Sequence, residues 1–599
     1  MPSRNRDTIK QISRVWSHLS PRRKKQLAVL AVLTFFASFA EAISIGAVLP
    51  FLAVLTSPEK IFAHQLAQPF IQLLQVQLAQ DLLLPFTLIF ITAAIFAGLS
   101  RVALLWIQTR LSMAIGADFS VQVYERTLYQ PYSVHVSRNS SEIIAGAQKA
   151  SGLVSTLIQP TLAISSSIIM LIALIATLIA IEPVVAFIVF LGFGSIYAVV
   201  IVATKHRIQK NSQIIASQQG IVTKAIQEGL GGIRDVIIDG TQRVYSNLYK
   251  DAFLPMQSAY ASNQVASASP RFGVETLGMV LIAGLAYVLA SASGLGGNRV
   301  DAIPLIGTLA LGAQRLLPML QQIYFSYNTI RGNQASTQDA IDLIDQPVPG
   351  NANAHADKPI AFQIAITLKD LGFRYDLRGY WVLRYLNLQI RKGSRVGFPG
   401  VTGSGKSTLL DIIMGLISPT EGSFFIDNVA VTPQNTRAWQ AHISHVPQMI
   451  FLADTSITEN IAFGVPAELI DLSRVKDAAR QAQISDTIEG WRSGYDTLVG
   501  ERGVRLSGGQ RQRIGIARAL YKRANVIIFE EATRALDNET EAAIMDAIEK
   551  IDREITIIMV AHRLGTLKSC DVIYELGNGR IKRQVSQREL SSDEKIISI

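Results

Sequence analysis

Six long apolar runs mark the N-terminal half of the chain. They cover Leu27–Thr56, Leu82–Ile107, Leu157–Ile181, Val184–Thr204, Phe272–Ala292 and Pro304–Ile323. Each is about as long as the roughly 20 apolar residues that a helix needs to cross a bilayer. The pattern therefore predicts an all-α domain over residues 27–345 with six transmembrane helices. An even number of spans returns the chain to the side on which it began.

Basic residues flank these runs unevenly. The connection after the first run holds only Lys60, the connection after the third run holds no Lys or Arg, and the connection after the fifth run holds only Arg299. The other two connections hold Arg110, Arg126, Arg138 and Lys149 after the second run, and Lys205, Arg207, Lys210, Lys224, Arg234, Arg243 and Lys250 after the fourth. Because cytoplasmic loops carry an excess of Lys and Arg, these two connections are expected to be cytoplasmic. Residues 1–26 then form a basic cytoplasmic segment, and the localisation is a plasma (inner) membrane.

The two long connections are rich in helix-forming residues and have few breakers. The second to fifth helices are therefore expected to continue past the bilayer and to turn near Gln130–His135 and Glu228–Arg234. Two ordinary polar helical loops are the alternative.

The first outward connection, Ser57–Gln80, has apolar residues at near-helical spacing. It predicts either an amphipathic helix in the interface or a helix packed on the outer ends of the spans.

Four ionisable residues, Glu41, Arg101, Glu275 and Arg315, fall inside the apolar runs. An Arg or Asp at the centre of a transmembrane helix costs roughly 2.5–3.5 kcal/mol, so these side chains should face a cavity or one another. Two interpretations remain open. In the first, ion pairs hold the bundle together; in the second, the two arginines line a wet cavity that accepts an anionic group.

Composition agrees with a membrane protein. Charged residues make up 17% of the chain and the mean hydropathy is +0.28. A linker rich in Pro, Gly and Asn covers residues 346–358, and residues 359–599 have the composition of a soluble domain. The net charge of +10 comes from residues at the membrane flanks and not from a basic block interleaved with aromatics, which argues against a nucleic-acid partner. The single cysteine, Cys570, allows no disulfide within the chain.

The stretch from Gly400 to Thr408 fits the phosphate-loop pattern G-x-x-x-x-G-K-[ST]. It lies between a strand-like run, 394–398, and a helix-like run, 409–416. The glycines allow backbone N–H groups to surround phosphates at a helix N-terminus. Lys406 supplies a positive charge to the outer phosphates, and Ser407 is placed to bind Mg²⁺. The cofactors predicted are therefore ATP and Mg²⁺.

A second motif follows at Leu506-Ser-Gly-Gly-Gln-Arg-Gln-Arg513. It resembles the signature sequence of the ABC ATPases, and it stands after the phosphate loop and before the stretch Val526–Glu531, as it does in that family. Six spans joined to one such ATPase resemble an ABC exporter half-transporter. The resemblance implies a six-helix transmembrane domain of the exporter type and an α/β P-loop ATPase domain with antiparallel β and helical subdomains.

The resemblance also implies roles for individual residues. Those expected to bind the nucleotide are Tyr375, Gly400, Gly403, Ser404, Gly405, Lys406, Ser407, Thr408, Ser507, Gly508, Gly509, Gln510 and Asp537. Those expected to act in hydrolysis are Gln448, Glu530, Glu531 and His562, and those expected to hold Mg²⁺ are Ser407, Gln448 and Glu530. Phe373, Tyr380 or Trp381 could take the place of Tyr375 against adenine.

Glu531 resembles the carboxylate that polarises the attacking water, and His562 resembles the histidine that senses the γ-phosphate. Two departures from the family pattern stand out. Glu530 occupies a position that is usually Asp, and its extra methylene could slow hydrolysis. Arg534 replaces the usual serine.

One phosphate loop and one signature per chain predict a homodimer. In the family, the signature of one subunit closes the ATP site of the other, so two copies would complete two sites. Closure would pull the ATPase domains together, and hydrolysis would release them, so that the membrane cavity alternates between the two sides of the bilayer.

The membrane half most resembles the flippases of lipid-linked oligosaccharides. The resemblance rests on Ser38-Phe-Ala-Glu-Ala, on Pro270-Arg-Phe-Gly-Val-Glu275 and on Arg315-Leu-Leu-Pro318. It implies an amphipathic, anionic lipid-linked substrate, with Arg101 and Arg315 binding its pyrophosphate. A related polysaccharide or glycolipid exporter, a multidrug or lipid exporter, and an ATP-regulated channel or sensor with weak hydrolysis are the alternatives.

Overall fold

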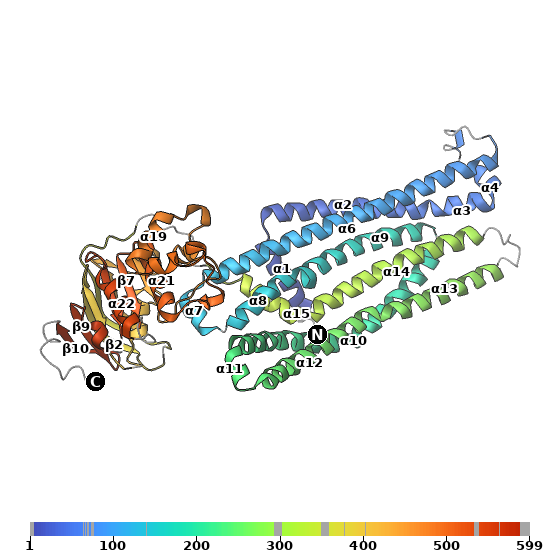
Figure 1. Cartoon of the computed structure of the whole chain (residues 1–599). Coiled ribbons are helices and arrows are strands. Elements are labelled where there is room, and N and C mark those ends of the chain that lie inside the picture. The colour runs from blue at the N-terminus through green and yellow to red at the C-terminus, as the bar shows by residue number, and fades with distance from the viewer. Residues whose placement is uncertain are drawn as a thin grey trace. The chain divides into compact units, whose positions relative to one another are not determined.

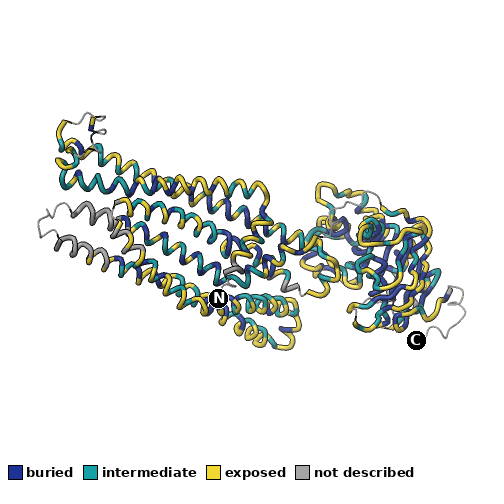
Figure 2. Tube along the Cα trace, turned by 180° about the vertical axis from the view of Figure 1, so that it is seen from behind, coloured by how far each residue is buried: buried dark blue, intermediate teal, exposed yellow. Residues whose placement is uncertain are grey.

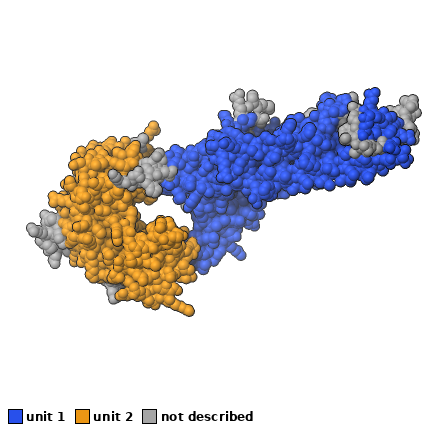
Figure 3. Space-filling view, turned by 90° about the horizontal axis from the view of Figure 1, so that it is seen from above, with its two compact units in different colours: residues 1–130, 135–348 blue, residues 131–134, 349–599 orange. Residues whose placement is uncertain are grey.

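The computed structural model describes residues 5–63, 65, 68, 71, 72, 77–138, 140–181, 183–292, 302–348, 359–376, 378–401, 403–531, 538–561 and 564–586. The chain divides into two compact units, residues 1–130 with 135–348 and residues 131–134 with 349–599 (Figure 3). The described part of the first unit is helical. The second combines two β-sheets with helices.

Long helices occupy the positions of the apolar runs (Figure 1). In chain order they and the shorter helices are α1 (Asn5–His18), α2 (Pro21–Gly46), α3 (Val48–Thr56), α4 (Pro58–Phe62), η1 (Ala79–Leu82), α6 (Leu83–Leu128), α7 (Tyr132–Ser137), α8 (Ser140–Leu153), the π-helical turn η2 (Val154–Ile158), α9 (Gln159–Ile181), α10 (Pro183–Gly231), α11 (Ile233–Ile238), α12 (Gln242–Ala268), α13 (Pro270–Ala292), α14 (Ala302–Gly332) and α15 (Gln334–Ile344). In the first unit α2 packs against α6 and α9, α9 against α14, and α10 against α12.

Three segments of the described chain are long and apolar enough to cross a membrane: Pro21–Thr56, Ala79–Leu128 and Gly146–Ala180. The other three predicted spans lie within α10, α13 and α14. On α2 and α6, large apolar residues are exposed, among them Phe35, Phe36, Phe39, Ile95, Phe96 and Leu99. Figure 2 shows exposed positions along the long helices in yellow. A continuous apolar surface of this kind requires an apolar solvent, as a bilayer provides.

The helices continue past the apolar runs, as predicted. Helix α6 has 46 residues and α10 has 49. At 1.5 Å per residue each is about 70 Å long, more than twice the roughly 30 Å hydrocarbon core. Their ends at Leu128 and Gly231 coincide with the two predicted turns.

The described part of the outer connection packs onto neighbouring helices. Val54, Ile71 and Leu82 are buried together, with Ile61 and Phe62 against them. This agrees with a segment packed on the outer ends of the spans. Residues 64, 66, 67, 69, 70 and 73–76, on which the amphipathic prediction also depended, lie outside the described residues.

The second unit contains two sheets. Its strands are β1 (Ala365–Phe373), β2 (Leu383–Arg391), β3 (Arg395–Phe398), β4 (Glu421–Ile426), β5 (Val429–Ala430), β6 (Ile443–Val446), β7 (Val526–Glu530), β8 (Thr556–Val560), β9 (Val572–Gly577) and β10 (Arg580–Ser586). A four-stranded antiparallel sheet has the order β2-β1-β4-β5, and a six-stranded sheet has the order β10-β9-β3-β8-β7-β6, parallel except for its β10 edge.

The second unit also contains helices. They include α16 (Lys406–Ile413), α17 (Thr436–Gln440), α18 (Ile457–Ile461), α19 (Leu472–Gln481), α20 (Ser485–Glu489), α21 (Gly508–Tyr521) and α22 (Asn538–Glu549), with short 3₁₀ turns at Ala467–Leu469, Gly494–Asp496, Glu501–Gly503 and Leu564–Leu567. Successive β7 residues alternate between two apolar cores: Val526 and Ile528 face one, Ile527 and Phe529 the other. A strand buried on both faces is typical of a parallel α/β sheet, and it fixes where the strand's polar C-terminal end emerges.

Candidate functional site

The phosphate loop connects β3 to α16 in the second unit. Parallel strands β8 and β9 flank β3, so the loop leaves the C-terminal edge of the sheet. Gly405, just before α16, has φ +99°, and a Cβ there would lie 2.7 Å from Leu383 Cδ2. Only glycine fits both the backbone conformation and the space. The loop consequently brings the backbone close to whatever binds at the start of α16.

Lys406 is the first residue of α16 and is 7% exposed. Its Nζ donates to the carbonyls of Gly400 at 2.6 Å and Val401 at 2.9 Å. Burial lowers the pKa of the Lys406 ammonium, opposed in part by the charge of Glu531. Among the described residues, only these two loop carbonyls accept hydrogen bonds from the buried ammonium. This fits a site for an anionic group, because a phosphate would supply the missing negative charge. The buried Oγ of Ser404, which has no hydrogen-bond partner among the residues that the structure describes, also fits a polar ligand.

Ser407 and Glu530 meet at the end of β7. The hydroxyl of Ser407 donates to Oε1 of Glu530 at 2.8 Å, and Nε2 of His445 lies 3.5 Å from Oε2 of the same carboxylate. The hydrogen bonds from His445 and Ser407 lower the pKa of Glu530 despite its burial. A hydroxyl and an ionised carboxylate are the oxygen donors that Mg²⁺ prefers, so the pair fits the ion.

His445 and Asp411 were not predicted from the sequence. His445 reaches the site because β6 pairs in parallel with β7, a contact that depends on the fold. Asp411 lies four residues after Ser407 on α16, a spacing that places both on one face of the helix. Burial, together with the nearby Glu530 charge, raises the pKa of Asp411 to about 6.

Glu531 follows β7 directly and has φ +46°. Its backbone N–H donates to the carbonyl of Val560 at 2.9 Å, which continues the β7–β8 pairing past the end of the strand. A non-glycine residue in the left-handed region carries local strain, and such strain is common at functional sites. The sheet therefore holds Glu530 and Glu531 next to each other at the edge from which the phosphate loop also emerges.

Tyr375 and Gln448 are both at the surface. Tyr375 is 68% exposed; its hydroxyl lies 3.3 Å from Oγ1 of Thr408, and its ring makes an edge contact with Phe373 at 5.0 Å. The structure therefore places this aromatic ring beside the start of α16. Gln448 is exposed two residues after β6.

The signature residues form the N-terminus of α21. Ser507 is the N-cap and makes a capping box with Gln510: Gln510 Oε1 accepts from the Ser507 N–H at 2.8 Å, and Ser507 Oγ accepts from the Gln510 N–H at 3.3 Å. Ser507 and Gly508 are exposed, whereas Gly509 is buried. Within the described residues, no hydrogen bond joins these four residues to the phosphate loop. The helix terminus is open to a ligand from outside the chain's own site. Asp537 and His562 lie outside the described residues.

The intramembrane charges form a cluster in the first unit. Glu41 on α2 is 1% exposed, and its Oε1 accepts from Nη1 of Arg315 on α14 at 2.5 Å. Nε of Arg101 on α6 lies 3.3 Å from the other oxygen, Oε2. One carboxylate thus faces two guanidinium groups, and the cluster carries a net charge of +1 when all three are ionised. Glu275 instead pairs with Arg271, four residues earlier on α13, at 2.7 Å.

Comparisons with known proteins agree with this architecture. A model of the ABC transporter transmembrane region matches residues 27–297, and an ABC transporter model matches residues 383–534. The ATP-dependent lipid A-core flippase of Saccharophagus degradans is 31% identical over 476 residues, 77% of each chain. The corresponding flippase of Alkalilimnicola ehrlichii is 32% identical over 405 residues, 67% of each chain.

The chain belongs to the ABC transporter family. It is an ATP-hydrolysing transporter with a membrane-spanning domain and an ABC ATPase domain, as the sequence predicted. Its fold is that of an ABC exporter half. A bacterial Atm1-family ABC exporter with ATP bound matches it with a TM-score of 0.75 at 22% identity, over 95% of this chain and 96% of that one.

Proposed function

We propose that two copies of this ABC transporter form an ATP-driven flippase for an anionic lipid-linked glycan, with Mg²⁺ as the metal cofactor. The inner membrane is the proposed location, with the ATPase domains in the cytoplasm. The observation that carries the substrate class is the cluster of Glu41, Arg101 and Arg315, whose net charge is positive at membrane depth.

The proposed roles at the nucleotide follow from the contacts of the ATPase unit. Lys406 exchanges its two loop carbonyls for the outer phosphates of ATP, and Ser407 with Glu530 and Gln448 holds Mg²⁺. Glu531 orients the attacking water, and His562 contacts the γ-phosphate. Tyr375 stacks on adenine. Ser507 to Gln510 and Asp537 act on the ATP of the second copy, and the open N-terminus of α21 supports that role.

The proposed role of the membrane cluster follows from its charge and exposure. The Glu41 side chain is 2% exposed, while those of Arg101 and Arg315 are 42% and 33% exposed. The carboxylate is therefore buried behind its partners, and the arginines are the accessible groups. A phosphate or pyrophosphate can share both guanidinium groups, whose planar donors match its oxygens. Glu275 is proposed to contribute less directly, since it is engaged by Arg271.

The test is ATP turnover of the protein in liposomes with and without substrate. Arg315→Ala is expected to abolish stimulation by a pyrophosphate-linked glycolipid and to leave basal turnover nearly intact, because the change removes one phosphate donor but still leaves Glu41 paired with Arg101. Arg110→Ala, which removes a more distal arginine on α6 that stacks on Trp106, is the matched control and should keep the stimulation. An unchanged stimulation curve for Arg315→Ala would reject the assignment.

The same assay separates the candidate substrates. Lipid-linked oligosaccharides come first because of the sequence resemblance, and lipid A-type glycolipids come second because relatives covering most of the chain carry the name lipid A-core flippase. Both classes combine acyl or prenyl chains with phosphate. Stimulation and leaflet exchange by one of them, and none by unrelated apolar cations, would support the proposal. Stimulation by the cations alone would favour a multidrug exporter.

A further inference from the structure

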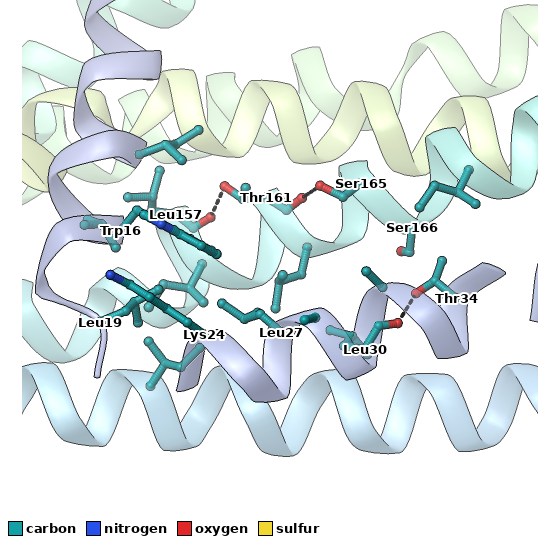
Figure 4. Close-up of a pocket in the computed structure, with 18 residues that line it drawn as sticks. Trp16, Leu19, Lys24, Leu27, Leu30, Thr34, Leu157, Thr161, Ser165 and Ser166 are labelled. Carbon is teal, nitrogen blue, oxygen red and sulfur yellow. Dashed lines mark hydrogen bonds between the residues drawn. The ribbon is translucent and has the colours of Figure 1, made fainter. Parts of the chain in front are cut away.

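An apolar cavity of about 480 Å³ lies in the first unit, between α1, α2, η2 and α9 (Figure 4). Its walls include Ile12 and Val15 of α1, Leu27 and Leu30 of α2, and Leu157 and Leu162. The volume falls within the range of roughly 300–1,000 Å³ that is usual for ligand cavities. The charge cluster of the proposed transport function contributes no residue to this cavity.

The four hydroxyl groups in its walls donate to backbone carbonyls. The hydroxyls of Thr34 and Thr161 donate to the carbonyls of Leu30 and Leu157 at 2.8 and 2.6 Å. Those of Ser165 and Ser166 donate to carbonyls of their own helix at 2.9 and 3.1 Å. Figure 4 draws the hydrogen bonds of Thr34, Thr161 and Ser165 as dashed lines. These hydroxyls therefore need no hydrogen bond from a ligand, which favours a hydrocarbon occupant over water.

One end of the cavity is cationic. Lys24 lines it, with its Nζ 5.8 Å from the ring centroid of Trp16, and both lie at the same end in Figure 4. The neighbouring Arg23 is already held by Asp118 at 2.8 Å. Among the described residues, Lys24 has no carboxylate partner. Arg22 and Lys25 add two exposed positive charges beside it.

We propose that this cavity holds one acyl chain of an anionic bilayer phospholipid, whose phosphate binds Lys24. The chain lies along α2 from Leu27 toward Thr34, and the headgroup remains at the level of the basic residues before the first span. Basic clusters next to a transmembrane helix attract anionic lipids, and an amphipathic tryptophan is typical of the interface. The occupant is a component of the surrounding membrane and not the transported lipid.

The bound acyl chain would contact α1, α2 and α9 together and so stabilise the position of α1. Helix α1 is also tied to α15: Nη2 of Arg14 lies 2.6 Å from Oδ1 of Asp342, and Nε2 of Gln11 lies 3.0 Å from Oε1 of Gln338. The lipid would therefore add a contact on one side of α1 while α15 holds the other. Its loss should loosen α1 without removing any residue of the proposed ATP site.

Fluorescence of Trp16 provides a direct probe. The full-length Trp106→Phe chain in neutral detergent would be titrated with phosphatidylglycerol or phosphatidylcholine brominated in the acyl chains, and the signal of a Trp16→Phe, Trp106→Phe chain subtracted. We expect phosphatidylglycerol to quench Trp16 at a lipid-to-protein ratio at least fivefold lower than phosphatidylcholine. Equal quenching by the two lipids, or none by either, would overturn the proposal.

Variants separate the headgroup from the cavity. Lys24→Gln is expected to abolish the preference for phosphatidylglycerol, and Ala31→Phe, which fills the cavity, to abolish quenching by both lipids. Ala28→Phe serves as a second filling variant if Ala31→Phe does not fold. Val32→Phe, on the exposed side of α2, should behave like the parent chain. Retained quenching in a folded filling variant, or displacement of the brominated lipid by a transported glycolipid but not by phosphatidylglycerol, would contradict the assignment.

Discussion

The two glutamates at the end of β7 have different surroundings. Glu530 is bound by Ser407 and lies beside His445, whereas Glu531 follows in a left-handed backbone conformation. The motif order in the sequence predicted both residues, and the extra methylene of Glu530 was visible there. The approach of His445 was not, because it depends on strand pairing across some 80 residues of sequence. The specific pairing of Glu41 with Arg315 was likewise not predictable from local sequence, because the two residues are 274 positions apart.

Glu531→Gln tests the proposed hydrolytic role. The amide keeps the shape of the side chain but cannot accept a proton from water, so ATP turnover should fall about 100-fold or more. Nucleotide-dependent dimerisation should persist, because the neutral side chain does not repel the γ-phosphate. Turnover and sedimentation in the presence of Mg²⁺-ATP measure the two effects. A variant with the parent's turnover would remove Glu531 from the role.

Asp411→Asn tests the electrostatics of α16. The folded pKa of Asp411 is about 6, above the ordinary value of 3.8, chiefly because of burial and then because of Glu530. Between these pH values the folded protein binds more protons than the unfolded one, so this group lowers stability as the pH rises. The variant should therefore unfold at a higher temperature than the parent above about pH 6, and the difference should vanish below about pH 3.8. Thermal unfolding of the nucleotide-free protein measures it; a pH-independent difference would contradict the explanation.

At the scale of elements, apolar run length was the strongest signal. It predicted the long helices because a membrane segment must bury its backbone hydrogen bonds within itself. Ile12 and Val15 in α1, with Leu19 just after it, also have helical spacing, which indicates an apolar face on this basic segment. The pair of Arg271 and Glu275 could equally have been predicted from its spacing of four. The π-helical turn η2 has no comparable signal in the sequence.

Helix α6 offers a test of close packing at η2. A Cβ on Gly116 would lie 1.7 Å from Cγ2 of Val154, whereas one on Gly98 of the same helix meets nothing within 4 Å. Gly116→Ala should therefore destabilise the bundle by about 1–3 kcal/mol through overpacking. Gly98→Ala, the matched control, should be neutral or stabilising by up to about 1 kcal/mol, since alanine favours helix. Thermal unfolding in detergent compares the two variants. Equal unfolding midpoints would contradict the prediction, because they would show that η2 accommodates the added methyl group without loss of stability.

At the scale of the whole molecule, each chain contributes one phosphate loop and one open signature helix. The phosphate loop and the end of β7 bring Lys406, Ser407 and Glu530 to one edge of the sheet, while Ser507 and Gln510 cap their own helix. The family resemblance predicted that the signature of one copy acts on the nucleotide bound by the other. No local pattern in a single chain could have predicted it. In the proposed transporter, a second copy therefore completes the nucleotide site.

Crosslinking between differently tagged copies tests that dependence most directly. Cys570→Ala removes the one native cysteine, Glu531→Gln retains ATP, and one copy carries Val401→Cys in the phosphate loop while the other carries Gly508→Cys in the signature. With Mg²⁺-ATP, a short bifunctional reagent should join the two tags in one covalent dimer, and without nucleotide it should not. If no dimer bearing both tags forms with ATP bound, the shared nucleotide site is contradicted.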